Sequence, residues 1–119
     1  MSTKKVVRKA ANSGSASQIL RTVSTNEAFR FFTVIGQDSG ISATSLADFS
    51  EKIKSVPLQS TEFHFKRGDF EWWIRDTLRD EYLANKIGRI DKSIQGEALR
   101  SEIQGIVRNR LSYLMQPKQ

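Results

Sequence analysis

The apolar positions of this chain recur with helical spacing in several segments, and the clearest segment lies just before Pro57. Its predicted buried face comprises Leu46, Phe49, Ile53 and Val56. These residues return every three or four positions, which is typical of one buried side of a helix. Ser45 is placed to cap the first turn, with Asp48 three residues on as its capping-box partner. Pro57 is expected to end the helix.

The same spacing predicts further helices on both sides of this one. The apolar stripe of residues 70–78 is Phe70, Trp73, Ile74 and Leu78, and that of residues 80–90 is Leu83, Ile87 and Ile90. The last helix, from Ser93 or Gly96 to Met115, has the stripe Leu99, Ile103, Ile106, Val107, Leu111 and Leu114. Asp69 and Asp80 are candidate caps. A short helix over 15–23 would bury Ile19, Leu20 and Val23.

Two segments show the pattern of strands instead. Residues 27–36 are rich in Phe, Val, Ile and Thr and have apolar residues on both faces, which predicts a central strand covered on both sides. In residues 60–67, Phe63 and Phe65 alternate with Glu62, His64 and Lys66, which predicts a half-buried strand. Asp, Ser and Gly together in 37–44 favour a loop. Since two strands make a weak sheet, a third strand is expected from 15–25 or 37–43, or from a second copy of the chain.

These elements predict an α+β fold, with a small two- or three-stranded sheet covered by three or four helices. A chain of 119 residues fits one domain, which we place at residues 16–116. Residues 1–15 are small, polar and basic with little to bury, so we expect a disordered tail there.

The charge of the chain is concentrated at its N-terminus. The net charge is +6, and residues 1–25 alone carry five bases and no acid. The remainder is nearly balanced, so the high isoelectric point mainly reflects the tail, which weakens the usual inference from a basic protein to nucleic-acid binding. No apolar run approaches a membrane span, and the N-terminus lacks the apolar core of a secretory signal. We therefore expect a soluble, cytoplasmic protein.

Composition also limits the chemistry. The chain has no cysteine and one histidine, His64. Disulfides, cysteine-ligated metals and sites with several histidines are thereby excluded. No phosphate-binding loop or dinucleotide fingerprint occurs, and one histidine leaves one candidate base for a hydrolase triad. We expect no catalytic residues, no metal and no cofactor, and hence no enzyme.

The segment 63–76, FHFKRGDFEWWIRD, packs five aromatic residues and six charges into its length. Its apolar residues are expected to pack in the core, with Gly68 supplying a tight turn from strand to helix. His64 is expected on the wet face of its strand as a hydrogen-bonded surface histidine. As an alternative, His64 and Arg67 form a ligand-binding pair for an anion at a helix N-terminus. Asp69 would repel an anion there.

Trp72 falls off the buried stripe of its helix. Two interpretations remain open. The indole covers the edge of the strand pair, or it is an exposed anchor for a partner, since tryptophan is frequent in interface hot spots.

Three pieces of the chain resemble a known family. Residues 42–49 show the order S-A-x-S-L-x-x-F, residues 62–74 show E-F-H-x-x-R-G-D-F-x-x-W-I, and DEYLANKIGRI follows. Together they are similar to an uncharacterised prokaryotic domain family, mainly archaeal, over about residues 29–90. Trp72 departs from the polar residue expected at its position. The family has no established activity, so the resemblance implies domain limits but no chemistry.

Two functions follow as hypotheses. The first is a non-catalytic protein-interaction or regulatory module that docks a partner, or a second copy of itself, through Trp72, with His64 and Arg67 as further candidates. The second is nucleic-acid binding, in which a basic arm and the last helix hold phosphates by counterion release. Its candidate contacts are Lys4, Lys5, Arg8, Lys9, Arg100, Arg108 and Arg110.

Overall fold

The computed structural model describes residues 14–117. In that part of the chain an antiparallel pair of strands is covered by helices, which confirms the predicted α+β class. The elements are α2 (Ala16–Leu20), the 3₁₀ helix η1 (Thr25–Glu27), β1 (Phe29–Val34), β2 (Gln37–Ala43), α3 (Leu46–Lys52), α4 (Leu58–Arg67), α5 (Asp69–Trp72), the π-helical segment η2 (Trp73–Thr77), α6 (Glu81–Gly88) and α7 (Gly96–Leu114).

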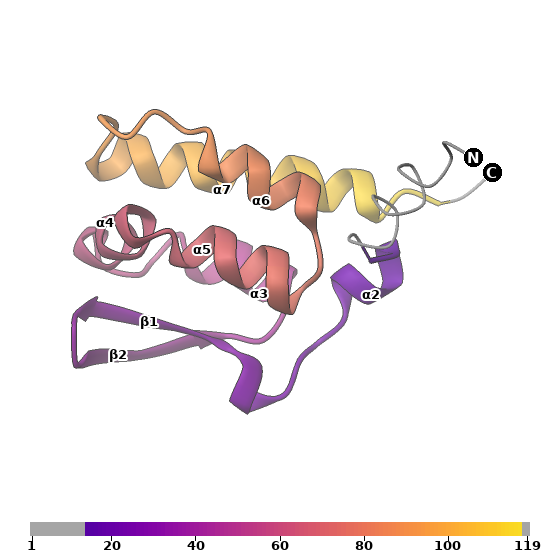
Figure 1. The fold of residues 1–119 in the computed structure, drawn as a ribbon, viewed down its shortest axis with the longest axis horizontal. Coiled ribbons are helices and arrows are strands. Elements are labelled where there is room, and N and C mark those ends of the chain that lie inside the picture. The colour runs from indigo at the N-terminus through magenta and orange to yellow at the C-terminus, as the bar shows by residue number, and fades with distance from the viewer. Residues whose placement is uncertain (1–13, 118–119) are drawn as a thin grey trace, which may run out of the picture.

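The elements form three layers (Figure 1). The hairpin of β1 and β2 is one outer layer, α3, α4 and α5 form the middle, and α6 and α7 form the other outer layer. Aromatic rings from β1, α3 and α5 fill the space behind the hairpin. Phe31 stacks on Phe49 with ring centroids 5.7 Å apart, and Phe49 meets Phe70 edge-on at 5.3 Å. The core therefore lies between the first two layers and continues towards α7.

Two of the three predicted helix caps, Ser45 and Asp80, are confirmed. The Ser45 hydroxyl accepts the Asp48 N–H at 3.0 Å, and the Asp80 carboxylate accepts the Leu83 N–H at 3.1 Å. The Asp48 carboxylate accepts the N–H of Thr44, one residue before the cap itself. The apolar stripes of α3, η2, α6 and α7 are buried for the most part, although Ile106 and Leu111 are only half-buried. Pro57 lies at the start of α4, after α3 has already ended at Lys52.

The loop predicted over residues 37–44 is wrong, whereas the alternative that 37–43 supplies a further strand is confirmed. Residues 37–43 form β2, which pairs with β1 from Phe29↔Ala43 to Val34↔Gln37. Gly36, at φ 81°, allows the chain to reverse there. The Ser39 hydroxyl donates to the Phe31 carbonyl, so a polar side chain supplies a bond across the irregular ladder. The turn-forming residues thus lie on an exposed strand.

The prediction that β1 is covered on both faces is also wrong. Phe29 and Phe31 are buried, but Phe32 is half-buried and Val34 is exposed. The sheet has only two strands within residues 14–117, so the hairpin has one covered face and one largely open face. The apolar residues of the open face are therefore available at the surface.

The strand predicted over residues 60–67 is a helix, α4. Its buried side consists of Ser60, Thr61, His64 and Phe65, a helical spacing in which three of the four residues are polar. The alternation of Phe63, His64 and Phe65 suggested a strand because His64 was taken as an exposed residue. When His64 is counted as buried, the buried residues of 60–65 follow the spacing of a helix rather than that of a strand.

The N-terminal tail predicted over residues 1–15 lies outside the described residues, except for Gly14 and Ser15. The Gly14 N–H donates to the Arg79 carbonyl at 2.7 Å, and the Ser15 hydroxyl caps α2. The short helix predicted over 15–23 is confirmed as α2, which ends at Leu20; Ile19 and Val23 are buried, whereas Leu20 is only half-buried. Of the helices in residues 14–117, none has the length and apolar character that a membrane crossing requires.

Candidate functional site

An open pocket of about 480 Å³ lies where β1, the hairpin turn, α4 and α5 meet. We call it the Trp72 pocket. It is lined by Asn26, Ala28, Phe29, Arg30, Phe32, Ile35, Gly36, Phe63, His64, Arg67, Asp69, Trp72 and Trp73. The pocket thus brings together all three predicted interaction residues, Trp72, His64 and Arg67.

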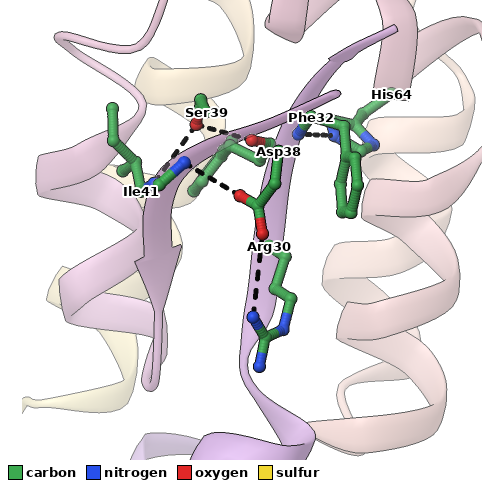
Figure 2. A network of polar contacts seen from close by, with 8 residues as sticks. Arg30, Phe32, Asp38, Ser39, Ile41 and His64 are labelled. Atoms are coloured by element: carbon green, nitrogen blue, oxygen red, sulfur yellow. Dashed lines mark hydrogen bonds and ion pairs between the residues drawn. The ribbon is translucent and has the colours of Figure 1, made fainter. Parts of the chain in front are cut away.

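His64 belongs to the wall of the pocket and is buried, with 4% of its surface exposed. The prediction of a surface histidine is therefore wrong. The Phe32 N–H donates to His64 Nε2 at 2.8 Å, as Figure 2 shows. Because Nε2 accepts this bond, the ring proton lies on Nδ1, which donates to Asp69 Oδ2 at 2.8 Å. His64 thereby ties β1 to the start of α5.

Asp69 does not cap a helix through its side chain, as the sequence had suggested. Its Oδ2 atom accepts bonds from His64 Nδ1 and from Arg67 Nε, the latter at 3.0 Å. Gly68 makes this possible because it takes a left-handed conformation, φ 78°, between α4 and α5. The turn joins two helices rather than a strand and a helix, and it places Asp69 beside the last turn of α4.

The surroundings of His64 favour its neutral form. Burial lowers the pKa of the His64 imidazole below its usual 6.5, while the hydrogen bond and charge of Asp69 act in the opposite direction. The Nε2 lone pair is occupied by a backbone N–H, which leaves no free acceptor for a substrate proton. Among the described residues that line the pocket, none carries a hydroxyl, thiol or amine side chain. Both imidazole nitrogens of His64 are thus engaged in hydrogen bonds that connect β1, α4 and the start of α5.

The rim of the pocket is apolar and exposed. Trp72 is 61% exposed and Ile35 at the hairpin turn is 78% exposed. Trp72 is therefore on the surface, beside residues of β1, as an exposed anchor would have to be. The neighbouring Trp73 is buried, and its indole N–H donates to the Glu27 carbonyl at 2.8 Å. One tryptophan fastens η1 to the core while the other faces outward.

Two guanidinium groups complete the lining. Arg30 is 3.7 Å from Asp38 and has half-exposed side-chain atoms, as Figure 2 shows for this ion pair. The Arg67 guanidinium lies over the Phe63 ring, 5.1 Å from its centroid. Asp69 is the lining carboxylate, and it is already bound by two donors. The lining is consequently aromatic with a net positive charge.

The arginines predicted to contact nucleic acid are placed differently from one another. Arg100 donates to the carbonyls of Lys54 and Val56, so it binds the chain just after α3. Arg110 donates twice to the buried Asp80, at 2.9 and 3.1 Å. Arg108 is exposed. The remaining candidates, Lys4, Lys5, Arg8 and Lys9, lie outside the described residues.

A second groove, of about 600 Å³, runs between α6 and α7. The Arg110 guanidinium lies over the rings of Tyr82 and Tyr113, at 4.7 and 5.4 Å from their centroids. The buried Asp80 forms an ion pair with this guanidinium, so the Arg110 side chain is held in place and partly fills the groove. Both tyrosines are exposed and provide a comparison for Trp72.

Several residues of the Trp72 pocket were not identified from the sequence, among them Asn26, Arg30, Phe32 and Ile35. They belong to β1, the hairpin turn and the segment before β1, where the sequence predicted a strand covered on both faces. A usable signal was the aromatic and aliphatic run that continues to Ile35 at the turn. Among residues 14–117 no three histidine or carboxylate side chains gather in a way that could hold a metal ion.

No family model, curated protein or solved structure matches the chain. The resemblance to a prokaryotic, mainly archaeal domain family therefore stays a prediction.

Proposed function

We propose that this protein is a non-catalytic interaction module that docks a partner protein in the Trp72 pocket. The observation that carries the proposal is the exposure of Trp72 and Ile35 on the rim of one pocket. Tryptophan in a hollow is frequent among residues that dominate binding energy. Exposed apolar side chains that cluster at a concave surface mark interaction sites more often than isolated ones do.

The wall of the pocket supports binding without a large rearrangement. His64, Asp69 and the Phe32 backbone form a connected set of hydrogen bonds that fixes β1 against α4 and α5. Trp73 fixes the segment before β1 in the same way. A pocket held by such bonds loses little conformational entropy when a partner binds, which favours affinity.

The proposal of a non-catalytic role is supported by the chemistry of the same residues. His64 offers no free nitrogen acceptor, and Asp69 is committed to two donors. A hydrolytic site needs a nucleophile and a base that converge. For a protein of this kind, free of cysteine, we propose the cytoplasm as its location.

Nucleic-acid binding is the second candidate, and the geometry of α7 lends it less support. Arg100 and Arg110 already make hydrogen bonds that hold α7 to the rest of the fold. Using them for phosphate would break these bonds. Arg108 remains as an exposed base on this helix, close to the acids Glu97 and Glu102 in the sequence. We therefore place protein docking first.

A selection from random displayed peptides tests the proposed function. The bait is the wild-type protein, with Trp72→Ala as the pocket variant and Tyr82→Ala as the control, because Tyr82 is a similarly exposed aromatic residue in another groove. We expect peptides that bind the wild type and Tyr82→Ala but lose binding to Trp72→Ala. Peptides that are indifferent to Trp72→Ala, or the absence of any binder, would refute docking in this pocket.

A further inference from the structure

We propose that the Trp72 pocket takes an extended peptide segment in which a carboxylate side chain stands next to a large apolar one. This inference rests on the proposed function, and it adds the chemistry of the partner. Three features of the pocket support it: its two half-exposed guanidinium groups, its exposed apolar rim and the edge of β1 that pairs with no strand within residues 14–117.

The positive charges around the pocket favour a carboxylate on the ligand. The side-chain atoms of Arg30 and Arg67 are 55% and 50% exposed. The ion pair of Arg30 with Asp38 spans 3.7 Å, and Arg67 uses its Nε atom for Asp69. Within residues 14–117 the terminal nitrogens of Arg67 have no hydrogen-bond partner. An entering carboxylate therefore meets two accessible guanidinium groups, which bind carboxylates in a charge-assisted, often two-pronged manner.

The exposed apolar rim of the pocket favours a large apolar side chain on the ligand. Trp72 and Ile35 are exposed, and the half-buried rings of Phe32 and Phe63 extend the apolar surface between them. At about 480 Å³ the pocket has the size of a binding site for a small molecule or a few side chains. Covering this rim removes apolar surface from water, which supplies the main driving force for association.

The extended backbone is suggested by the direction of the carbonyl groups in β1. The Phe31 carbonyl accepts from Ser39 on β2, so it points towards the paired edge. Successive carbonyls along a strand point to opposite edges, which directs the Arg30 carbonyl to the edge that pairs with no strand in the described part of the chain. The Phe32 N–H on that edge is already taken by His64.

The Arg30 carbonyl can accordingly accept an N–H from a peptide that lies along β1, in a short form of strand addition. The Phe32 N–H already donates to His64, and the Glu27 carbonyl already accepts from the Trp73 indole. A peptide can therefore pair with β1 only over the short stretch between these two residues. The side chains of the peptide then provide most of the contact. This limit protects the edge from indiscriminate pairing with other strands.

Charge-restricted peptide libraries test the inference. Each library offers the same apolar and neutral residues, and the charged residues are only Asp and Glu, only Lys and Arg, or absent. We expect binders that depend on Trp72 from the acidic library. For a synthetic peptide from that selection, replacing its carboxylate by the amide should weaken binding about tenfold or more, and added salt should weaken it as well.

Variants of the protein complete the test. Arg67→Gln and Arg30→Gln should each weaken the acidic peptide by about tenfold, whereas Arg108→Gln, at an exposed arginine of α7, should leave it unchanged. Arg30→Gln removes only a long ion pair, so it remains informative even where Arg67→Gln disturbs Asp69. Isothermal titration measures the affinity, and circular dichroism verifies folding.

The outcomes separate this inference from the proposed function. Suppose that neutral or basic peptides bind equally well through Trp72 and that neither arginine variant affects their binding. The proposed carboxylate preference would then be refuted, while protein docking in the Trp72 pocket would still hold. If a single-stranded oligonucleotide binds the wild type and loses binding in Trp72→Ala, the pocket binds nucleic acid, and the proposal of a peptide ligand is refuted. Should no library contain a binder that depends on Trp72, both proposals fail.

Discussion

Replacing His64 by alanine should strongly destabilise the fold, because this side chain joins three elements. The variant leaves the Phe32 N–H without its acceptor, and an orphaned buried donor costs about 1–3 kcal/mol. The imidazole is packed among phenyl rings, with centroids 4.8 Å from Phe29 and 5.0 Å from Phe63. Its removal opens a cavity of roughly 60 Å³, which at about 24 cal/mol per Å³ costs about 1.5 kcal/mol. The expected total is about 2.5–4.5 kcal/mol.

Urea unfolding followed by tryptophan fluorescence measures this loss. A domain of this size has an m-value of about 1–3 kcal/mol per molar urea, so the midpoint should fall by at least about 1 M. The matched control is Tyr82→Ala, which removes a largely exposed ring and should change the free energy of unfolding by less than about 1 kcal/mol. A loss below about 1 kcal/mol for His64→Ala would show that the Phe32 N–H is hydrated without His64, and the structural role assigned to this histidine would be refuted.

Three further perturbations follow from the structure. Because the pKa of His64 is lowered in the folded protein, the unfolded chain binds the proton first, so stability should fall as the pH drops from 6.5 towards the lowered pKa. Urea titrations across this range should show less dependence on pH for His64→Gln, and an unchanged slope would contradict the assignment. Asp80→Ala should cost about 3–5 kcal/mol by thermal or urea unfolding, because it leaves Arg110 without its buried partner and removes a helix cap; a surface-like loss below about 1 kcal/mol would argue against the pair. Gly68→Ala should cost about 1–2 kcal/mol since its φ is 78°, whereas Gly105→Ala, where a Cβ meets open space within α7, should gain up to about 1 kcal/mol; equal effects in calorimetry would contradict this contrast.

The helices that the sequence predicted correctly carry their own local signals. α3 and α6 each begin at a side chain that accepts an N–H three residues later, and each has a stripe of apolar residues. α7 has a stripe long enough to be recognised despite Gly105 in its middle. Such features depend on neighbours within a few positions, so they can be read without knowing the rest of the fold.

The segment of α4 could not be read in this way, because its buried side is mostly polar. Ser60, Thr61 and His64 are buried together with Phe65. A histidine whose two nitrogens both have protein partners can occupy a core position, and these partners come from β1 and from Asp69. Neither contact is visible in the local pattern. The strand prediction failed because burial of His64 depends on residues distant in sequence or across a turn.

At the candidate site, the unusual position of Trp72 was recognised from the sequence, whereas the neighbouring residues of the hairpin were not. Trp72 was found because it departs from the stripe of its own helix, which is a local observation. The hairpin residues beside it were missed because 37–44 was read first as a loop, with a strand at 37–43 only as an alternative, so Ile35 was assigned to a covered strand rather than to a hairpin turn. Two-residue hairpin turns favour polar residues and glycine, yet Ile35 stands there with 78% of its surface exposed.

Two departures from local rules thus meet at one pocket: an isoleucine in a hairpin turn and a tryptophan off the buried stripe of its helix. Each exposes a large apolar side chain at a cost in solubility, and neither is required by the core, which is complete without them. Local inconsistency of this kind is expected where a sequence serves binding rather than folding. Both residues lie at a pocket whose wall is held by His64, and this coincidence is the physical reason for proposing protein docking there. In the groove between α6 and α7, by contrast, the charges of Asp80 and Arg110 already pair with one another.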